Sequence, residues 1–267
     1  MATIDARALL HEMRQRAPLV HHLTNWVTIN DCAQVTRHWG CLPVMAHAIE
    51  EVEEMAAIAG ALVLNIGTLT PGLIDAMAKA AVAANKKGIP VVLDAVGAGA
   101  TKLRTESCRR LLHAARIDVI KGNAGEIATL AGVQAEVRGV ESISTAGDAF
   151  DFARELAKDR NAVVAITGKT DIVSDGKRTF ALDYGHPLMG RVVGTGCVGT
   201  STLGCFAAVS PDLTLAAAAA LGAYGIAGER AAKRSEGPGD FFKNFFNEIA
   251  KMARDETPLT VEAVEVK

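Results

Sequence analysis

Residues 60–97 read GALVLNIGTLTPGLIDAMAKAAVAANKKGIPVVLDAVG. Two short apolar runs, GALVLNIG at 60–67 and IPVVLDAVG at 89–97, flank an alanine-rich amphipathic segment at 73–88. Short apolar runs bounded by glycine or proline are typical of buried strands, whereas the longer segment has the length and apolar spacing of a helix. The order strand, helix, strand predicts two parallel strands joined by a crossover helix.

The same alternation of strand and helix continues beyond this segment. Its further members are a helix at 106–115, a strand at 117–123, a helix at 124–132, a helix at 146–159 and a strand at 161–169. Strands and helices that alternate in this way predict an α/β fold with a mostly parallel central sheet and helices on both faces. Since no repeat, low-complexity segment or linker interrupts the pattern, we expect a single domain over residues 1–267.

Three later segments depart from this alternation. Residues 170–185 contain two strand-like runs around an Asp-Gly turn signal, which predicts an antiparallel hairpin at one edge of the sheet. After Gly194 the chain is almost wholly helical, and Phe242, Phe245 and Phe246 recur at a helical spacing that is typical of core residues. The last residues, 257–267, are expected to be loosely held.

The composition argues against several classes of partner. Of the 267 residues, 49% are hydrophobic and 22% are charged, and 28 basic against 30 acidic residues give a formal net charge of -2. The basic residues form no long run of the kind that follows nucleic acid or an anionic membrane, so we expect a small-molecule ligand, with no nucleic acid and no membrane as partner. Residues 1–18 lack the apolar core of a signal peptide and no uncharged apolar run approaches the length of a membrane span, so a cytoplasmic protein is expected.

The cysteines, histidines and tryptophans are expected to be structural, apart from Cys197. The five cysteines form an odd set without a C-x-x-C pair, which argues against a disulfide framework and against a thiolate zinc site. His21 and His22 are adjacent on a predicted strand, where neighbouring side chains point to opposite faces, so we do not expect them to share a metal. Trp26 and Trp39 are better explained by packing than by stacking on a base.

Residues 194–201, GTGCVGTS, match one phosphate-binding fingerprint and nearly match another. Gly194, Gly196 and Gly199 fit G-x-G-x-x-G, but they occur late in the chain, and LAAAAAL stands about 20 residues further on, where a dinucleotide site needs an acid. The P-loop pattern also fails, because Thr200 replaces the lysine that contacts the phosphates. What remains is a helix start of small residues, which either binds an anion with its free N–H groups and positive dipole end or serves tight packing alone.

Seven short motifs lie at predicted strand ends or loops, where open α/β sheets bind their ligands. In chain order they are NWVTIND (25–31), PVMAHA (43–48), VLNIGTL (63–69), VLDAVGAGA (92–100), IKGNAGEI (120–127), AITGKTD (165–171) and VVGTGCVGTS (192–201). Together they resemble the hydroxyethylthiazole kinase family of the ribokinase-like fold, from about His21 to the Phe-rich helix. The resemblance implies a three-layer sandwich and transfer of the γ-phosphoryl group of ATP, with Mg2+, to the primary hydroxyl of 4-methyl-5-(2-hydroxyethyl)thiazole in thiamine biosynthesis or salvage.

The resemblance also implies a catalytic group and a metal site. Gly194, Thr195 and Gly196 would form the anion hole, and Cys197 stands where most ribokinase-like enzymes have an aspartate base. Asp94 and Glu126 would hold Mg2+ directly or through water, as suits an ion that keeps several of its waters. Taken alone, these two acids would be interpreted as a helix N-cap and as a partner of a helix dipole.

Binding positions for the two substrates follow from the same resemblance. Lys121, Thr167 and Gly168 match positions that contact ATP, and Asn123 accompanies them in the N-x-x-E motif. The thiazole positions are Asn25, Val27, Thr28, Met45 and Gly194. The polarizable thioether of Met45 suits a small sulfur-containing aromatic ring.

Residues 1–90 contain no strand-rich insertion of the kind with which sugar kinases of this fold cover their site, so we expect no lid. The resemblance implies a homotrimer with active sites at subunit interfaces, and the loop at 65–72, NIGTLTPG, is the candidate cover from a neighbouring subunit. Two other functions stay open. One is ATP- or ADP-dependent dehydration of a hydrated nicotinamide cofactor, whose enzymes have aspartate in the place of Cys197. The other is non-catalytic nucleotide binding, which would apply if Asp94, Glu126 and the anion loop did not converge.

Overall fold

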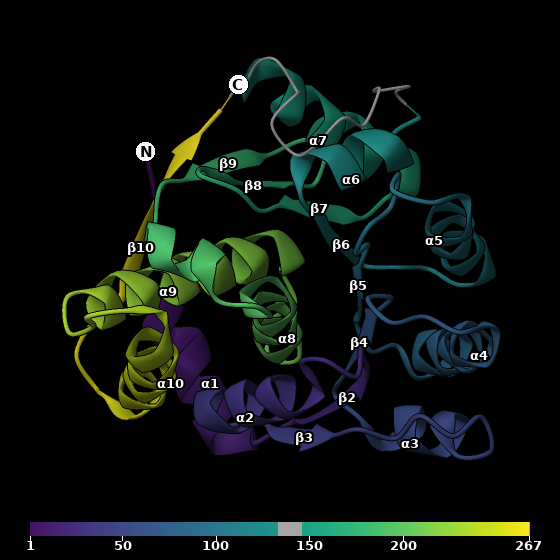
Figure 1. Ribbon diagram of the computed structural model, residues 1–267, viewed down its shortest axis with the longest axis horizontal. Helices are drawn as coiled ribbons and strands as arrows, with labels where there is room; N and C mark the ends of the chain where they lie inside the picture. Colours follow the sequence, from purple (N-terminus) through teal and green to yellow (C-terminus); the bar gives the residue numbers. More distant parts are fainter. Residues whose placement is uncertain (133–145, 267) are drawn as a thin grey trace.

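The structure, a computed structural model, describes residues 1–132 and 146–266. Its strands form one ten-stranded sheet in the order β1-β10-β9-β8-β7-β6-β5-β4-β2-β3 (Figure 1). The strands are β1 (Ala2–Asp5), β2 (Leu19–Leu23), β3 (Leu42–Val44), β4 (Ala61–Asn65), β5 (Val91–Asp94), β6 (Val119–Gly122), β7 (Val163–Ile166), β8 (Asp171–Ser174), β9 (Thr179–Leu182) and β10 (Thr260–Glu265). All the pairings among β2 to β7 are parallel, so the predicted mostly parallel sheet is confirmed.

Helices cover both faces of this sheet (Figure 1). One layer contains α1 (Ala6–Arg16), α2 (Ile29–Trp39), α8 (Thr195–Ala207), α9 (Leu213–Ala232) and α10 (Pro238–Arg254). The other layer contains α3 (Val52–Ile58), α4 (Pro71–Lys87), α5 (Lys102–Ala114), α6 (Ala124–Leu130) and α7 (Ala146–Arg160). Each layer has its own apolar core against the sheet, which confirms the three-layer sandwich. Every strand in residues 1–90 belongs to the central sheet, so this part of the chain forms no lid, as predicted.

Local sequence signals explain the limits of the helix that was predicted at 73–88. The Thr70 side chain accepts a hydrogen bond from the Leu73 N–H, and Pro71 occupies the first turn of α4, where its missing N–H costs nothing. Gly88 ends the helix with φ 78°, a left-handed conformation that glycine adopts without strain.

Glycines let α8 and α9 contact the sheet directly. A Cβ atom at Gly204 would overlap the Val63 side chain on β4, and one at Gly222 would overlap Val261 on β10. The absence of these side chains allows a close helix-to-sheet approach, which brings the N-terminal turn of α8 near the ends of β4, β5 and β6.

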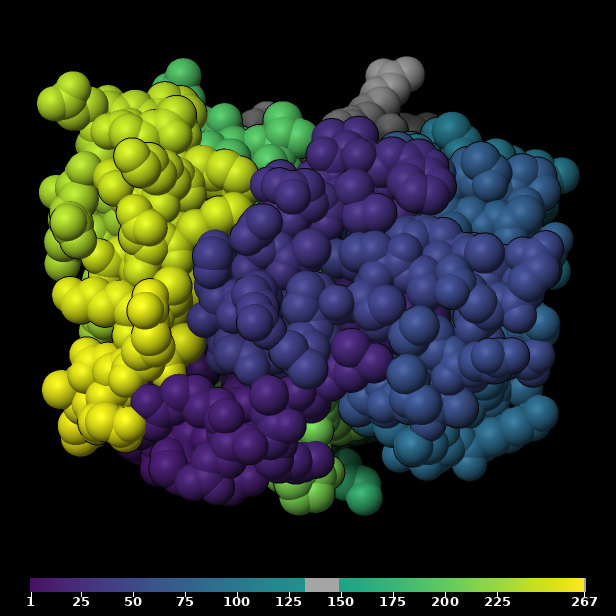
Figure 2. Space-filling view, turned by 90° about the horizontal axis from the view of Figure 1, so that it is seen from below, coloured from purple at the N-terminus to yellow at the C-terminus, as the bar shows by residue number. Residues whose placement is uncertain are grey.

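The second half of the sheet differs from the sequence prediction in two ways. Strands β8 and β9 form the predicted antiparallel hairpin, but it is not at the sheet edge, because β10 and β1 lie beyond β9. The expectation of loosely held residues at 257–267 is wrong for Thr260–Glu265, which pairs with both β1 and β9 and buries Val261 and Ala263. The first and last strands of the chain are consequently neighbours, and Figure 2 shows the N-terminal (purple) and C-terminal (yellow) parts of the chain in contact.

The helical part after Gly194 is largely as predicted. Phe245 is buried, which confirms its core prediction, and the half-buried Phe246 packs against the same core. Phe242 is half-buried and contacts Phe246, with ring centroids 4.6 Å apart. None of the described helices combines the length and the apolar character that crossing a bilayer requires.

Candidate active site

The polar residues of the predicted motifs gather at the carboxyl ends of parallel strands. β4 ends at Asn65, β5 ends at Asp94, and Lys121 is the last residue but one of β6. The strand register places Asn65 beside Asp94 and Asp94 beside Lys121. Ligands of open α/β sheets bind at this edge, so the topology alone brings these side chains to one site.

Asp94 is the centre of the buried polar network. Its Oδ1 accepts a hydrogen bond from Lys121 Nζ at 3.2 Å. Its Oδ2 accepts from Asn65 Nδ2 at 2.8 Å and from Thr200 Oγ1 at 2.6 Å. The carboxylate therefore links three strands of the sheet to α8.

Lys121 remains charged although it is buried. Burial by itself would lower the pKa of its ammonium group, but the nearby Asp94, Glu126 and Cys197 outweigh burial and raise this pKa. The ammonium also donates to the Gly196 carbonyl at 3.1 Å. A positive charge thus stands under the first turn of α8.

Glu126 forms a reciprocal capping box with Asn123. The Asn123 side chain accepts from the Glu126 N–H at 2.9 Å, and Glu126 Oε2 accepts from the Asn123 N–H at 2.7 Å. Glu126 Oε1 accepts from the Gly97 N–H at 2.6 Å, and burial raises the pKa of the Glu126 carboxyl. The carboxylate thus holds together the loops that follow β5 and β6, and the helix-terminus interpretation of Glu126 is correct in this structure.

The first turn of α8 is rigidly placed. Gly194 caps the helix with φ 97° and without a side-chain hydrogen bond to the helix, so it leaves the first N–H groups open to a ligand. A Cβ at Gly194 would lie 2.5 Å from Thr28 Cγ2, so the site tolerates only glycine there. Tyr224 donates its hydroxyl hydrogen to the Thr195 carbonyl at 2.6 Å, and Thr195 Oγ1 donates to the Met189 carbonyl at 2.9 Å.

Cys197 is half-buried and belongs to the same network as Asp94. Asn25 Nδ2 lies 3.3 Å from Cys197 Sγ and 3.1 Å from Asn65 Oδ1. Asn65 in turn donates to Asp94, so two asparagine side chains connect the thiol to the carboxylate. The Asn25 Oδ1 accepts from the Val27 and Thr28 N–H groups and thereby holds the start of the Asn25–Thr28 turn.

A cavity of about 840 Å³ opens on the other side of the α8 start. Thr167 and Gly168 line it together with Thr195 and Gly196, so the structure unites residues that lie about thirty positions apart in the chain. The volume is within the range of small-molecule and cofactor sites. Lys121 and Asn123 are not among its lining residues; Lys121 reaches it only through Gly196, and the Asn123 side chain caps α6.

The predicted thiazole positions are only partly brought together. Asn25 and Thr28 are buried next to Gly194 and Cys197, but Val27 is 67% exposed. Met45 is half-buried at the end of β3. His47 connects Met45 to the segment that precedes Asn25. Its Nδ1 donates to the Met45 carbonyl at 2.9 Å, and its Nε2 accepts from the Thr24 N–H at 3.0 Å.

The two tryptophans differ in environment. Trp39 is fully buried and donates from Nε1 to Thr202 Oγ1 at 2.9 Å, as the packing interpretation requires. Trp26 is 55% exposed, with its ring centroid 4.8 Å from that of His47. Trp26 therefore packs on the His47 ring at the surface and not in the core.

Sequence reasoning missed two members of the network. Asn65 belongs to the loop predicted to cover a neighbouring subunit, but it is buried and hydrogen-bonded within its own site. Thr200 was considered only as the residue that breaks a P-loop pattern, yet it donates to Asp94. A signal for Asn65 existed, because ALVLN and VVLD both end an apolar run in a polar side chain.

Asp94 and Glu126 lie near enough to influence each other, since Asp94 contributes to the raised pKa of Glu126. Within residues 1–132 and 146–266, however, no group of three or more His, Cys, Asp or Glu side chains could enclose a metal ion. Any ion held by these two carboxylates would keep waters in its remaining positions, which is usual for Mg2+.

A profile of the hydroxyethylthiazole kinase family matches residues 10–255. This chain belongs to the hydroxyethylthiazole kinase family. It is 54% identical over 256 residues to a hydroxyethylthiazole kinase of Methanocella arvoryzae, covering 95% of this chain and 96% of the relative. A relative of the same name from Methanosarcina mazei is 53% identical over 257 residues, covering 96% of this chain and 98% of the relative.

Solved structures agree with this assignment. A hydroxyethylthiazole kinase from Pyrococcus horikoshii superposes with a TM-score of 0.87 at 41% identity, covering 98% of this chain and 99% of that one. A ribokinase-like superfamily protein from Enterococcus faecalis superposes with a TM-score of 0.67 at 13% identity, covering 93% of this chain and 95% of that one, which shows the fold alone. The resemblance and the ribokinase-like fold predicted from the sequence are both confirmed.

The buried His22 predicts how stability depends on pH. Burial lowers the pKa of His22 to about 3, against about 6.5 in an unfolded chain. Below about pH 6.5 the unfolded state therefore binds a proton that the folded state excludes, and the free energy of unfolding falls. We expect His22→Gln to gain about 2 kcal/mol relative to the wild type between about pH 7 and about pH 5, as measured by urea unfolding.

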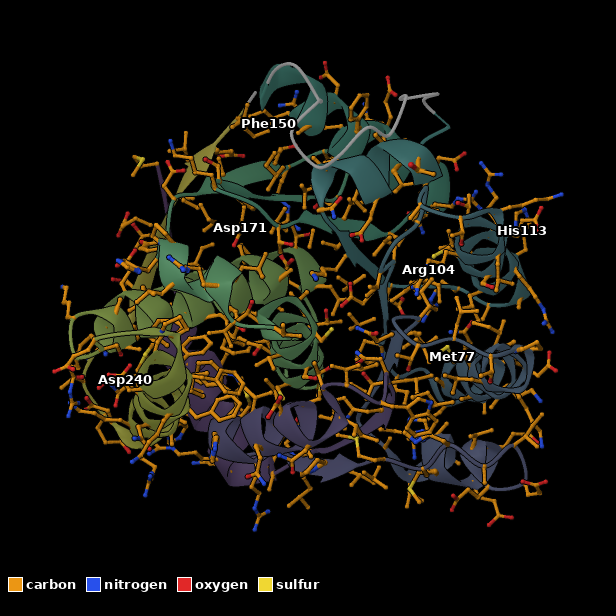
Figure 3. The ribbon with its side chains drawn as sticks, in the orientation of Figure 1. Met77, Arg104, His113, Phe150, Asp171 and Asp240 are labelled. Atoms are coloured by element: carbon orange, nitrogen blue, oxygen red, sulfur yellow. The ribbon has the colours of Figure 1, made fainter. Side chains whose placement is uncertain are left out.

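The free energy of unfolding of the variant must be compared with that of the wild type at each pH, because Asp171 changes the stability of both proteins with pH in the opposite direction. Its pKa is raised to about 7 by burial, so its contribution to stability grows as the pH falls, equally in both proteins. His113→Gln, which replaces an exposed imidazole on α5, is the control for loss of a histidine (Figure 3). A constant difference between the His22→Gln variant and the wild type at all pH values would contradict the prediction.

Proposed function

We propose that this chain phosphorylates the primary hydroxyl of 4-methyl-5-(2-hydroxyethyl)thiazole with ATP, in thiamine biosynthesis or salvage. Membership of the family supports this reaction. The observation that carries the proposal is the position of the α8 start between the large cavity and the Asn25–Thr28 turn. Thr195 and Gly196 line the large cavity on one side, while Gly194 and Cys197 contact Thr28 and Asn25 on the other. A phosphoryl group can pass between two ligands only at such a shared boundary.

ATP would bind in the large cavity with its phosphates toward the α8 start. The open N–H groups of that turn favour an anion, and the Lys121 ammonium beneath Gly196 adds a positive charge. Thr167 and Gly168 would contact the nucleotide at the opposite wall, with Asn123 shaping the loop behind Lys121. Phosphoryl transfer through a loose transition state depends mainly on such positioning and charge.

Asp94 and Glu126 would hold Mg2+ close to the phosphates, directly or through water. The ion, when bound, neutralises charge on the phosphates. The carboxylates suit it because Asp94 Oδ1 and both oxygens of Glu126 accept one hydrogen bond each and keep a further lone pair, whereas Asp94 Oδ2 already accepts two. Both are fixed by protein donors, so they would meet the ion without reorganisation.

Cys197 would accept the proton of the substrate hydroxyl. Its sulfur lies in the first turn of α8 and within hydrogen-bond distance of Asn25 Nδ2 at 3.3 Å. The cysteine would act late in a reaction that positioning and charge dominate. The thiazole would then lie near Asn25, Thr28, Gly194, Val27 and Met45.

The exposed apolar residues beside the Asn25–Thr28 turn support a subunit interface at this place, as the homotrimer implied by the family resemblance requires. Trp26, Val27 and Val193 are 55%, 67% and 77% exposed, and large exposed apolar side chains next to a site are typical of an interface. In the loop at 65–72, the residues after Asn65 are the candidate cover for the neighbouring active site, because Asn65 itself is buried. We also propose that the enzyme is cytoplasmic and that residues 1–267 form one domain. Sedimentation analysis tests the trimer, and a fully active monomer would exclude it.

Two activity assays and a measurement of nucleotide binding separate this function from its alternatives. ADP release is measured with the thiazole alcohol, with hydroxymethylpyrimidine and with simple sugars, and we expect turnover with the thiazole alcohol. Dehydration of a hydrated nicotinamide cofactor is measured separately, because a dehydratase of Bacillus subtilis shares this fold with a TM-score of 0.59 at 12% identity. Turnover of sugars alone would overturn the substrate, dehydration alone would favour the dehydratase, and nucleotide binding without turnover would favour a binding module. A non-catalytic binding module is disfavoured by the contact that joins Asp94 to α8.

The metal assignment predicts the effect of removing each carboxylate charge. We expect Glu126→Gln to lower kcat by about 100-fold and to raise the Mg2+ concentration that gives half-maximal rate, since an amide is a poor ligand for Mg2+. Asp94→Asn should act in the same direction and also lower Tm, because buried Lys121 loses its ionic partner. Steady-state kinetics across Mg2+ concentrations measure both effects. Glu106→Gln, on the exposed face of α5, is the control, and wild-type kinetics in both site variants would remove both residues from the metal site.

The role of Cys197 predicts three pH profiles. We expect Cys197→Ser to retain part of the activity, and Cys197→Asp, whose carboxylate is ionised at neutral pH, to be at least comparably active. The rate at saturating substrates is measured across pH for the wild type and both variants. Cys108→Ala is a matched control, because Cys108 is buried in the opposite layer and burial raises the pKa of its thiol to about 12. Superimposable profiles of equal height for all Cys197 variants would exclude a base at this position.

A further inference from the structure

Asp171 lies in the wall of the large cavity and has no part in the mechanism above. It is the first residue of β8, and Figure 3 shows it between the β8–β9 hairpin and the helices α8 and α9. Its Oδ1 accepts a hydrogen bond from the Gly168 N–H at 3.0 Å. The carboxyl therefore closes the turn from Thr167 to Thr170, which faces the same cavity.

The other carboxyl oxygen of Asp171 is available to a ligand. Among the described residues, none forms a hydrogen bond with Oδ2, and this atom is not among the fully enclosed polar atoms without a partner. The residue is half-buried because it opens toward the cavity, while protein surrounds it elsewhere. A molecule in the cavity would consequently meet an acidic group there.

The surroundings of Asp171 disfavour its negative charge. Burial raises the pKa of its carboxyl to about 7; the Gly168 N–H and the more distant Lys121 act against this rise, and Asp183 adds to it. The ionisable groups that line this cavity or influence Asp171 are Lys121, Lys169, Asp183, Tyr184, His186 and Tyr224. Asp183 belongs to the same wall, where its Oδ1 accepts from Thr170 Oγ1 at 2.6 Å.

We propose that Asp171 is a positioning residue of the Thr167–Thr170 turn and that it takes up one proton from solvent when a nucleotide polyphosphate enters the cavity. The proton binds Oδ2, and the Gly168 hydrogen bond to Oδ1 is kept. The anionic phosphates repel the carboxylate in this enclosed space, and protonation removes the repulsion and creates an O–H donor toward the ligand. This inference rests on the proposed nucleotide site.

Calorimetry of ADP binding tests the proton uptake. At about pH 8, one unit above its pKa, about nine-tenths of Asp171 is ionised before binding. ADP with Mg2+ is titrated into the enzyme in buffers of small and large ionisation heat, and the slope of binding heat against ionisation heat gives the protons taken up. We expect the wild type to take up at least about half a proton more per ADP than Asp171→Asn.

The matched control removes the other charge of the same wall. Asp183→Asn should retain or increase the proton uptake, because Asp183 contributes to the raised pKa of Asp171 and its loss leaves Asp171 more fully ionised before binding. Proton uptake that is equal in the wild type and Asp171→Asn, or absent in the wild type, overturns the proposal. Absence of ADP binding in the wild type contradicts the proposed function instead.

Kinetics test the positioning role. Asp171→Ala removes the acceptor of the Gly168 N–H, so we expect the KM for ATP to rise about 5- to 20-fold while the KM for the thiazole alcohol changes less than about twofold. Asp171→Asn keeps Oδ1 as an acceptor and should restore most of the affinity for ATP. Equal losses for both substrates would indicate a general structural defect and would overturn the role, as would an unchanged KM for ATP. Thermal unfolding of each variant verifies that it is folded.

Discussion

The ion pair between Asp94 and Lys121, 3.2 Å apart and almost wholly buried, is the interaction on which the rest of the site depends. Taking two charges out of water is costly, and their attraction compensates only if the remaining lone pairs and hydrogens also find partners. Asn65 and Thr200 provide these partners to Asp94, and the Gly196 carbonyl provides one to Lys121. The pair is therefore satisfied only when β4, β5, β6 and α8 are all in place.

This requirement makes the position of α8 a consequence of the polar network as well as of apolar packing. Gly204 allows α8 to contact Val63 on the sheet, and Thr200, one turn earlier, then reaches Asp94. The open N-terminal turn is thereby placed beside the Lys121 ammonium, and Tyr224 fixes that turn from α9. An anion site made of backbone N–H groups needs such support, because its geometry depends on where the whole helix lies.

The two sides of this turn differ in how complete they are within one chain. The large cavity is bounded by the hairpin, by η1 (Pro187–Arg191) and by α9, all from the same chain. On the other side Trp26 and Val27 are exposed, although Asn25 before them and Thr28 after them are buried. The polar side chains of Asn25 and Thr28 thus find their hydrogen-bond partners within the chain, whereas the apolar side chains of Trp26 and Val27 are exposed. A neighbouring subunit would cover these apolar side chains in the homotrimer that we propose.

The sequence alone was sufficient for the alternation of strands and helices, the parallel sheet, the helix start at Gly194 and the family. These follow from periodicity and from short motifs, which are local properties of the chain. It was not sufficient for the place of β10, the exposure of Trp26 or the hydrogen bonds of Asp94. Those depend on which residues meet across the fold: Asn65 and Asp94 are 29 positions apart, and Thr200 and Asp94 are 106 apart. Strand register and the approach of α8 decide these contacts, and no local pattern specifies either, because side chains pair according to where their backbones are packed.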